Sequence, residues 1–384
     1  MKTKQALVPK LRFAKFKTEW ETTTISDIAK VSSGGTPSRS NSSYWGGNIP
    51  WVTTTQIDFN TIKSALQFIT EEGVKKSAAK LLSAGTLLMA LYGQGKTRGK
   101  VAILGLDAAT NQACASICLN ENIALIRFVF LDLQRRYEEI RDLSNDGGQK
   151  NLSGQLVKSL TVSTPTLPEQ EKIAAFLTSV DDRIDQLKRK KSLLQDYKKG
   201  VMQKLFSQEL RFKDDHGIPY PDWEEKKLGE VLSIGSGKDY KHLNKGGIPV
   251  YGSGGIMTYV DQFLYDGESV CIGRKGTIDK PQFRSGKFWT VDTLFYTHSF
   301  KGVVPKFILS IFQNIKWYRY NEASGVPSLS KGTIEKIPIT IPSLPEQTKI
   351  ANFLSTLDQK IEQIDTQITL TQTFKKGLLQ QMFI

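Results

Sequence analysis

Cysteine and histidine are scarce in this sequence, with three of each in 384 residues. Cys114 and Cys118 are spaced C-x3-C, but no second Cys or His pair follows them, so the spacing predicts no zinc site. We expect all three thiols, Cys271 included, to be buried in a protein of the reducing cytoplasm. The histidines have no nucleophile or metal-ligand cluster to match them, which leaves no candidate for a histidine-based catalytic site.

Motifs typical of membrane proteins and enzymes are also missing. No apolar run approaches the ~18 residues that span a bilayer, and no signal peptide is expected at the N-terminus. The sequence has no [ND]-P-P-[YFW] methyltransferase motif and no H-E-x-x-H zinc motif. The stretch GQGKT at 93–97 ends like a phosphate-binding loop, but that motif needs glycine where Ala90 stands. We therefore predict no catalytic residue and no metal site in this chain.

A long internal repeat is the main positive feature of the sequence. Residues 164–206 and 341–383 align without a gap and agree at 20 of 43 positions, including LPEQEKIAAFL and LPEQTKIANFL. The front of each half matches too, because LRF followed by WETTTISDIA from Trp20 resembles LRF followed by WEEKKLGEV from Trp223. Two copies of roughly 190 residues indicate a duplicated domain rather than a solenoid.

Each repeated segment is predicted to form one long helix. A capping box is expected at Thr166-x-x-Glu169 and at Ser343-x-x-Glu346, with each glutamate reaching back to the amide of its cap residue. Apolar residues then recur in steps of three and four, the heptad rhythm of a coiled coil. About 38 residues make a helix of roughly 57 Å. A helix that long with a narrow apolar seam needs a partner helix, and the other copy supplies one.

Lysine interrupts the seam at the same phase in both copies, at Lys198 and Lys375. One interpretation is that the last third of each helix is solvated and loose. The other is that helices of a second protein complete a bundle there. The sequence leaves both open.

The net charge of +14 is concentrated outside the helices. Segments 168–206 and 345–383 hold 13 Lys and Arg against 10 Asp and Glu, which leaves +11 on the rest of the chain. That part is rich in short β-favouring runs broken by Gly, Asn and Ser, which indicates mixed α/β domains with many loops. Basic domains of this kind favour a polyanionic partner, with nucleic acid as the first candidate.

Two glycine-flanked loops in each half carry polar and cationic side chains suited to phosphate contact and base reading. One loop lies in SSGGTPSRSNSSYWGG and in SIGSGKDYKHLNKGG, and the other in LYGQGKTRGK and in CIGRKGTIDK. Their recurrence in both halves favours a shared function over ordinary solvent loops. The predicted DNA-binding residues are Thr36, Ser38, Arg39, Tyr44, Trp45, Gln94, Lys96, Thr97, Arg98, Lys238, Tyr240, Lys241, Arg274, Lys275 and Thr277.

Two non-identical globular regions, each followed by an LPEQ-type helix, resemble the specificity (S) subunit of a type I restriction–modification system. The resemblance is carried by TPTLPEQEKIAAFLTSVDDRI and IPSLPEQTKIANFLSTLDQKI, by GGTPSRSNSSYWGGNIPW, by the KKG at 198–200 and by LLQQMF near the end. It implies an α/β (mixed) fold with two target-recognition domains, 11–163 and 207–340. Two long antiparallel coiled-coil helices, 164–206 and 341–384, would separate them as spacers, with an internal pseudo-two-fold repeat.

The same resemblance implies a function. Each recognition domain would read one half of an asymmetric bipartite site in double-stranded DNA, and the helix pair would set the gap. Two modification (methyltransferase) subunits would dock on the helices, and restriction subunits would join through the complex. This chain would bind no cofactor, whereas its partners would use S-adenosylmethionine, ATP and Mg²⁺. The residues expected to contact the modification subunits are Glu169, Gln170, Phe176, Lys198, Lys199, Glu346, Gln347, Phe353, Lys375 and Lys376.

Three other functions compete with this one. An enzyme with its own active site would need an added catalytic segment, and two domains with two helices already occupy the chain. A coiled-coil scaffold that binds only protein would not need basic, loop-rich domains, and salt-sensitive DNA binding would exclude it. An autonomous DNA-binding regulator remains the third, although no helix-turn-helix pattern stands out.

Overall fold

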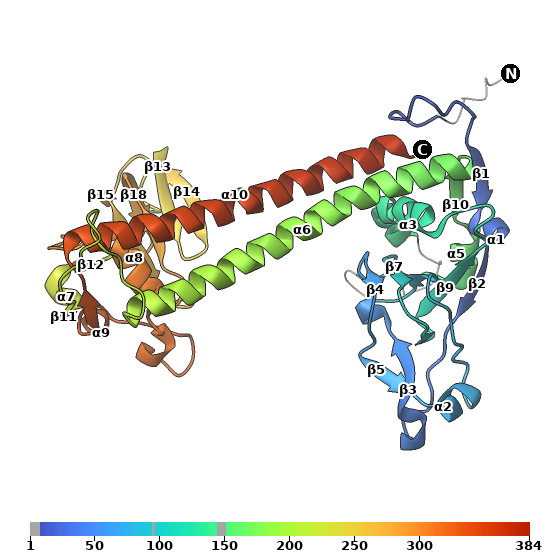
Figure 1. Ribbon diagram of the computed structural model, residues 1–384, viewed down its shortest axis with the longest axis horizontal. Coiled ribbons are helices and arrows are strands. Elements are labelled where there is room, and N and C mark those ends of the chain that lie inside the picture. The colour runs from blue at the N-terminus through green and yellow to red at the C-terminus, as the bar shows by residue number, and fades with distance from the viewer. Residues whose placement is uncertain (1–7, 94–96, 144–150) are drawn as a thin grey trace. The chain divides into compact units, whose positions relative to one another are not determined.

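The computed structural model describes residues 8–93, 97–143 and 151–384 of the chain. The chain forms two compact units (Figure 1). Unit 1 comprises Met1–Gln186 and Ile368–Ile384, and unit 2 comprises Leu187–Gln367. Each unit therefore combines the globular region of one repeat with the start of the long helix that follows it and the end of the other long helix.

Unit 1 is built on small sheets of two, five and three strands, with the orders β1-β10, β2-β9-β6-β7-β4 and β5-β3-β8. Its strands are β1 (Glu21–Thr24), β2 (Ala29–Ser33), β3 (Trp45–Val52), β4 (Thr61–Ile62), β5 (Gln67–Ile69), β6 (Leu87–Ala90), β7 (Val101–Leu104), β8 (Ala109–Thr110), β9 (Cys114–Leu119) and β10 (Thr161–Thr164). Its helices are α1 (Ile25–Ile28), α2 (Glu71–Lys75), α3 (Ile126–Arg135), α4 (Tyr137–Asp142), α5 (Gly154–Ser159) and the first part of α6 (Leu167–Phe206).

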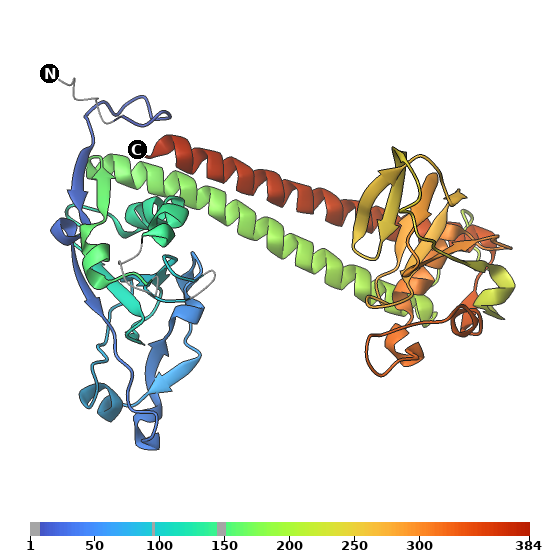
Figure 2. The ribbon, with the colours of Figure 1, turned by 180° about the vertical axis from the view of Figure 1, so that it is seen from behind.

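Unit 2 repeats this plan with sheets β11-β20, β12-β19-β16-β17 and β14-β13-β18-β15 (Figure 2). Its strands are β11 (Glu224–Lys227), β12 (Ser233–Ser236), β13 (Lys245–Gly252), β14 (Gly255–Val260), β15 (Tyr265–Asp266), β16 (Ser269–Gly273), β17 (Gln282–Arg284), β18 (Lys287–Thr290), β19 (Leu294–His298) and β20 (Pro338–Ile341). Its helices are α7 (Leu228–Val231), α8 (Pro305–Asn314), α9 (Lys331–Glu335) and the first part of α10 (Leu344–Met382). The mixed α/β content and the repeat predicted from the sequence are confirmed.

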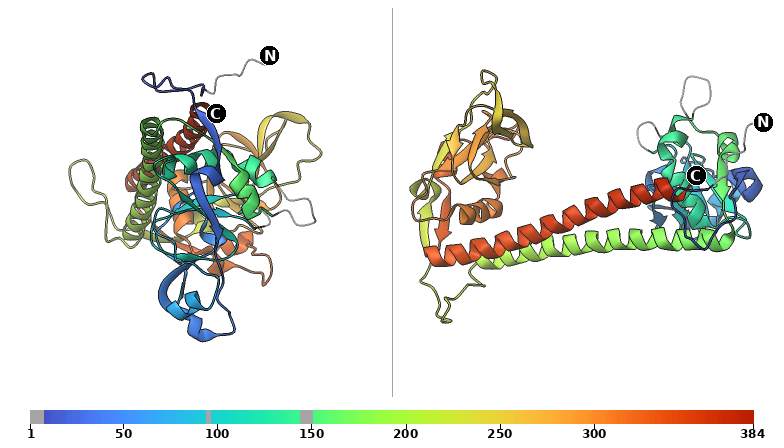
Figure 3. Two further views of the ribbon diagram at one scale, coloured as in Figure 1. Left: turned by 90° about the vertical axis from the view of Figure 1, so that its right-hand side faces the viewer. Right: turned by 90° about the horizontal axis from the view of Figure 1, so that it is seen from above.

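The apolar seam of each long helix is buried within the units. In unit 1 the start of α6 and the end of α10 lie side by side (Figure 3). Their apolar side chains belong to one core with those of α3. The helix residues in that core are Ile173, Leu177, Val180, Ile184, Leu378, Leu379 and Met382. In unit 2 the end of α6 and the start of α10 share a core with α8. Its helix residues are Met202, Leu205, Ile350, Ala351, Leu354 and Leu357. Most of these residues lie at the three- and four-residue spacing that predicts the apolar seam.

The lysines that interrupt the seam are paired within the chain. Lys198 donates to Asp358 at 2.6 and 2.8 Å in unit 2, and Lys375 lies 2.6 Å from Asp181 in unit 1. Both lysines and both aspartates are 177 positions apart, so the repeat makes the same ion pair twice. The two helices continue past these lysines to Phe206 and Met382. The interpretation of a loose, solvated last third is therefore wrong.

The predicted capping boxes are also wrong, because both glutamates have other partners. Glu169 accepts from Arg12 at 2.7 and 2.8 Å. Glu346 accepts from Arg211 at 3.2 and 2.8 Å. The hydroxyl of Ser343 is buried with no hydrogen-bond partner among the described residues. Each arginine follows the leucine of an LRF triplet, so the front of each repeat is anchored to its own long helix.

The cysteines divide into two kinds. Cys114 and Cys271 are buried, and burial raises the pKa of each thiol to about 12. Cys118 is exposed at the far end of β9, so the expectation of three buried thiols is wrong for this residue. Cys114 and Cys118 are four residue steps apart along the strand, or roughly 13 Å, which is too far for both thiols to bind one metal ion. No group of three possible metal ligands, and no helix long and apolar enough to cross a membrane, occurs in 8–93, 97–143 and 151–384.

Candidate nucleic-acid interface

Three loops of unit 1 meet at the end of the β6–β9 strand pair. The Gly35 N–H, after β2, donates to the Thr110 carbonyl at 2.8 Å. The Leu91 N–H, after β6, donates to the Ala113 carbonyl at 2.8 Å. The residues between β8 and β9 thus hold the two loops that the sequence singled out.

Unit 2 repeats this junction bond for bond. The Lys238 N–H, after β12, donates to the Thr290 carbonyl at 2.9 Å. The Arg274 N–H, after β16, donates to the Thr293 carbonyl at 2.8 Å. The loop between β18 and β19 therefore occupies the same place in unit 2 as the loop between β8 and β9 in unit 1.

A glycine allows this close approach in each unit. A Cβ atom on Gly34 would lie 2.0 Å from the Thr110 carbonyl oxygen, and one on Gly237 would lie 1.9 Å from the Val291 carbonyl oxygen. Backbone atoms cannot yield to such a clash without moving the loop. Glycine is therefore needed at both places to set the loop junction.

The first predicted loop of unit 1 splits into two groups. Thr36 lies at the junction and donates its hydroxyl proton to Gln112. Arg39 lies further out, with its guanidinium carbon 3.7 Å from the ring centroid of Trp45 and a hydrogen bond of 2.8 Å to Gln67. The indole N–H of Trp45 donates to the Ser38 carbonyl at 3.1 Å. Tyr44 is partly buried beside them and accepts a backbone bond from Thr70. Arg39 is thus held over an aromatic platform rather than left free in solvent.

The corresponding loop of unit 2 borders an open cavity of about 680 Å³. The loop is fixed by the Trp289 indole, which donates to the Lys238 carbonyl at 2.9 Å. Lys241 is exposed and Tyr240 is partly buried. The cavity is lined by Asp239, Tyr240, Lys241, the turn 252–257, Val291, Asp292 and Thr293.

The loops LYGQGKTRGK and CIGRKGTIDK do not place their arginines at equivalent positions, although their sequences suggest it. Arg274 stands at the place of Leu91, so Arg98 in unit 1 has a different position from Arg274 in unit 2. Arg274 and Lys275 are exposed and Thr277 is partly buried. Thr97 and Arg98 form a turn that leads into β7 rather than into a helix, which agrees with the exclusion of a phosphate-binding loop. Gln94 and Lys96 lie outside the described residues.

The loop that joins the other two was missed by sequence reasoning. It contains Gln112 in unit 1 and Asp292 in unit 2, both exposed. A signal was present, because TNQACASI and TVDTLFYT each place a threonine and then a polar residue just before a buried strand. Only the strand pairing shows that these residues face the loop after β2 or β12.

Four of the residues predicted to contact modification subunits are buried and have partners inside the chain. Glu169, Gln170, Glu346 and Gln347 are at most 1% exposed. Gln170 accepts from the Leu125 N–H at 2.8 Å and donates to two carbonyls. Gln347 makes the same three bonds in unit 2, accepting from Val304. Each glutamine caps the start of α3 or α8, which explains why LPEQ occurs twice.

The other predicted contact residues differ in how much surface they offer. Phe176 and Phe353 pack against Phe13 and Phe212, with ring centroids 5.9 and 5.8 Å apart. Lys198 and Lys375 are engaged in the ion pairs with aspartate described above. Lys199 and Lys376 are exposed.

An unpredicted pair of apolar side chains is exposed on each long helix. Leu193 and Tyr197 on α6, in unit 2, are 63% and 53% exposed. Leu370 and Phe374 on α10, in unit 1, are 63% and 57% exposed. Members of each pair are four residues apart and therefore share a helix face. The two pairs are 177 positions apart, so the repeat presents the same apolar patch twice.

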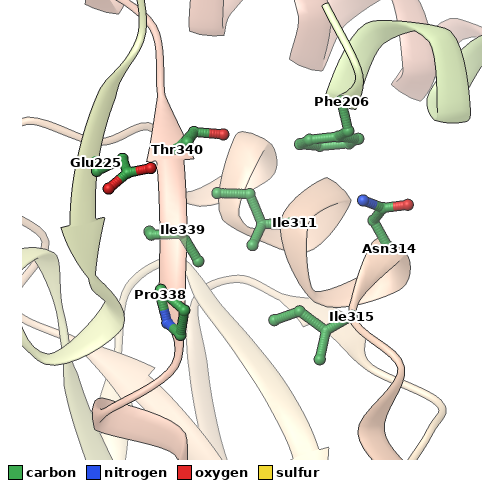
Figure 4. Close-up of a pocket in the computed structure, with 8 residues that line it drawn as sticks. All are labelled: Phe206, Glu225, Ile311, Asn314, Ile315, Pro338, Ile339 and Thr340. Atoms are coloured by element: carbon green, nitrogen blue, oxygen red, sulfur yellow. The ribbon is translucent and has the colours of Figure 1, made fainter.

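A second cavity in unit 2, of about 340 Å³, lies away from the loop junction (Figure 4). It is lined by Phe206, Glu225, Ile311, Asn314, Ile315, Pro338, Ile339 and Thr340. In unit 1 the residue that follows α3 is Arg136, whose guanidinium bonds to Asp132 and to the Thr161 carbonyl. Ile315 follows α8 in the same way, but its side chain is shorter than that of Arg136. The cavity therefore marks a packing difference between the units.

Comparisons with known proteins agree with this duplicated plan. A family model described as "Type I restriction modification DNA specificity domain" matches residues 17–195 and 220–372. The chain is 25% identical to the MjaIX specificity subunit of Methanocaldococcus jannaschii, covering 95% of this chain and 92% of that protein. It is 23% identical to the EcoprrI specificity subunit of Escherichia coli, covering 87% and 86%. Its fold is similar to a type I S subunit from M. genitalium, with a TM-score of 0.65, 18% identity and coverage of 98% and 99%.

Each of the two duplicated domains has the same loop junction, but the side chains at the two junctions differ. The fold therefore defines a class of protein that presents two different surfaces on equivalent backbones. The chain belongs to the type I restriction–modification DNA specificity family. Its function is to provide DNA sequence specificity in such a system.

Proposed function

We propose that each unit reads one half of an asymmetric, interrupted site in double-stranded DNA. The observation that carries this proposal is the loop junction, which has the same backbone bonds in both units and different side chains. Thr36 and Gln112 in unit 1 are replaced by Asp239 and Asp292 in unit 2. Side chains of different hydrogen-bonding character select different bases, so the two halves of the site are unequal.

The cationic side chains near the junctions supply the contacts that hold DNA in register. Arg39, Lys241, Arg274 and Lys275 are exposed, and arginine and lysine on loops suit phosphate contact. Arg39 also carries an aromatic platform beneath its guanidinium. These residues, with the others predicted from the sequence, make up the proposed DNA-binding surface.

We further propose that α6 and α10 form an antiparallel pair that sets the gap between half-sites. The ion pairs Lys198–Asp358, Lys191–Asp365 and Asp181–Lys375 support this arrangement. In unit 2 the later residue of α6, Lys198, meets the earlier residue of α10, Asp358, and Lys191 meets Asp365. In unit 1, Asp181 in the first half of α6 meets Lys375 near the end of α10. That pattern within both units is the one an antiparallel coiled coil would give.

The duplicated apolar patches are the proposed docking surfaces for two modification subunits. Leu193 with Tyr197, and Leu370 with Phe374, present the same exposed apolar surface beside exposed Lys199 and Lys376, respectively. An exposed aromatic side chain beside an exposed leucine on one helix face favours protein contact over solvent. Two equivalent patches suit two copies of one partner.

The chain is proposed to act without chemistry of its own, in the cytoplasm. Modification subunits would bring S-adenosylmethionine, and restriction subunits joined through them would bring ATP and Mg²⁺. The chain's own residues would bind DNA and position those subunits on it.

Replacing Tyr197 with alanine should weaken the binding of one modification subunit by about tenfold, because buried aromatic anchors carry much of an interface's energy. Phe374→Ala should do the same for the other copy, and the double variant should lose both. Native mass spectrometry of the co-expressed complex gives the number of copies bound. Leu66→Ala, at a 77% exposed apolar residue outside the helices, is the matched control. Full two-copy assembly by the double variant would contradict the docking proposal.

The reading proposal is tested by selecting bound duplexes from a random DNA pool with the purified complex of this chain and its modification subunits. The expected product is one two-part motif with unequal halves and a fixed gap. Enrichment of a single uninterrupted motif, or of none, would contradict the proposed function.

A further inference from the structure

We propose that Gln112 and Asp292 determine the base read at one position of each half-site, and that Asp292 together with Asp239 reads a cytosine. This inference rests on the proposed function, in which each unit reads one half-site. It assigns chemistry to a loop that the sequence motifs did not mark.

The two residues occupy the same point of the scaffold. Gln112 directly follows Asn111, whose N–H donates to the Val52 carbonyl at 3.1 Å at the end of β3. Asp292 directly follows Val291, whose N–H donates to the Tyr251 carbonyl at 3.0 Å near the end of β13. The backbone therefore presents both side chains from equivalent places, and only their chemistry differs.

Each of these residues also has an equivalent neighbour from the loop after β2 or β12. In unit 1 that neighbour is Thr36, which follows Gly35 and donates its hydroxyl proton to the Gln112 carbonyl oxygen. This bond uses the carbonyl oxygen of the Gln112 amide and not its N–H donors. In unit 2 the neighbour is Asp239, which follows Lys238, and it lines the same cavity as Asp292.

The unit 2 cavity offers room for the edge of a base. Its volume is about 680 Å³, and it is lined in part by residues 252–257, the turn between β13 and β14 with the adjoining strand ends. Four of that turn's six residues, Gly252 to Gly255, are small, so bulky side chains do not fill the space. Lys241 on the rim can contact a phosphate while the carboxylates face the base.

The donors and acceptors of the bases decide which partner fits each pair. An ionised carboxylate only accepts hydrogen bonds. In the major groove cytosine offers its N4 amino group alone, whereas adenine places an acceptor beside its amino group and guanine offers only acceptors. Two carboxylates therefore favour cytosine. A glutamine amide both donates and accepts, which matches adenine. One scaffold thus reads different bases through a change of two side chains.

Selection from a random DNA pool by the complex with modification subunits tests this assignment. The unaltered chain should enrich a motif with a cytosine at one position of one half-site. Asp292→Asn should lower discrimination at that position by about tenfold, because an amide also donates, and should leave every other position unchanged. Gln112→Glu should alter one position of the other half-site only. Asp266→Asn removes the same charge from unit 2 outside the cavity and should change nothing.

The outcomes separate this inference from the proposed function. If the unaltered chain selects a two-part motif and Asp292→Asn selects the same bases with the same discrimination, position 292 does not read a base and the inference is overturned. Equal weakening at all positions would also overturn it, because that marks a phosphate contact. If the unaltered chain selects no two-part motif, the proposed function fails and this inference fails with it.

Discussion

Lengthening both long helices by four residues should widen the gap in the DNA site by about two base pairs and leave both half-sites unchanged. Four helical residues add about 6 Å, and one base-pair step is ~3.4 Å. The insertions belong after Gln186 in α6 and after Gln367 in α10, where each helix passes from one unit to the other. Methylation mapping in cells that also express the modification subunit gives the gap directly.

These positions keep the internal contacts of both units intact. The pair Asp181–Lys375 lies wholly within unit 1, and the pair Lys198–Asp358 wholly within unit 2. A four-residue insertion is close to one helical turn, so the apolar seam keeps nearly the same phase. An insertion of four residues in the exposed segment 215–217 is the control and should not alter the gap. If the helix insertions left the gap unchanged while methylation continued, the helices would not set the spacing.

Replacing Arg211 with alanine should lower the free energy of unfolding of unit 2 by about 3 kcal/mol, because it leaves the buried carboxylate of Glu346 without its cation. Glu346 has no exposed surface, and Arg211 supplies two of its three hydrogen bonds. The third comes from the indole of Trp223 at 3.2 Å. For a unit of this size the loss corresponds to a fall of about 10 °C in the unfolding temperature, measured by calorimetry of the full chain.

A matched ion pair on the same helix provides the control. Lys349 contacts Asp215 at 2.6 Å, but that aspartate is 89% exposed. Exposed ion pairs contribute little because solvent screens them, so Lys349→Ala should leave the unfolding temperature nearly unchanged. The counterpart of the Arg211 variant in unit 1 is Arg12→Ala, which removes the cation from buried Glu169 and should have a similar effect there. Equal, small effects of Arg211→Ala and Lys349→Ala would contradict the anchoring role of the LRF arginine.

The large features of the fold were predictable because they depend on local sequence. The repeat is visible by aligning the chain with itself, and the burial of Leu177 and Leu354 follows from the spacing of apolar residues along one helix. The exclusion of a phosphate-binding loop needed only the identity of residue 90. The inferences on burial and on the loop use residues that are neighbours in the sequence, and the repeat needs only a comparison of two segments of the sequence.

The errors share a physical cause, which is contact between distant residues. Glu169 has the position and chemistry of a capping residue, yet Arg12, 157 positions away, offers a stronger, charge-assisted partner. In the sequence, Lys198 only interrupts the apolar seam of its helix, and the structure shows that it pairs with Asp358. The sequence also does not show that Gln170 recurs because it bonds to the Leu125 N–H at the start of α3, 45 positions away. In a duplicated chain, a residue can therefore occur in both copies because it stabilises the fold of each copy.

The loop junction could not be assembled from the sequence for the same reason. Thr36 and Gln112 are 76 positions apart, and the register of β2, β8 and β9 brings them together. Arg98 and Arg274 looked equivalent because both follow a glycine-rich strand end, but strand pairing places Arg274 opposite Leu91 instead. Loop sequences show which residue types are present, and strand register decides which of them meet.

Mapping of DNA methylation across the genome of a host without other methylases, after co-expression of this chain with its modification subunit, tests most directly whether two unlike readers share one chain. We predict a single motif with two unequal halves separated by a fixed gap. Methylation at one uninterrupted or symmetric motif would contradict the assignment of one half-site to each unit.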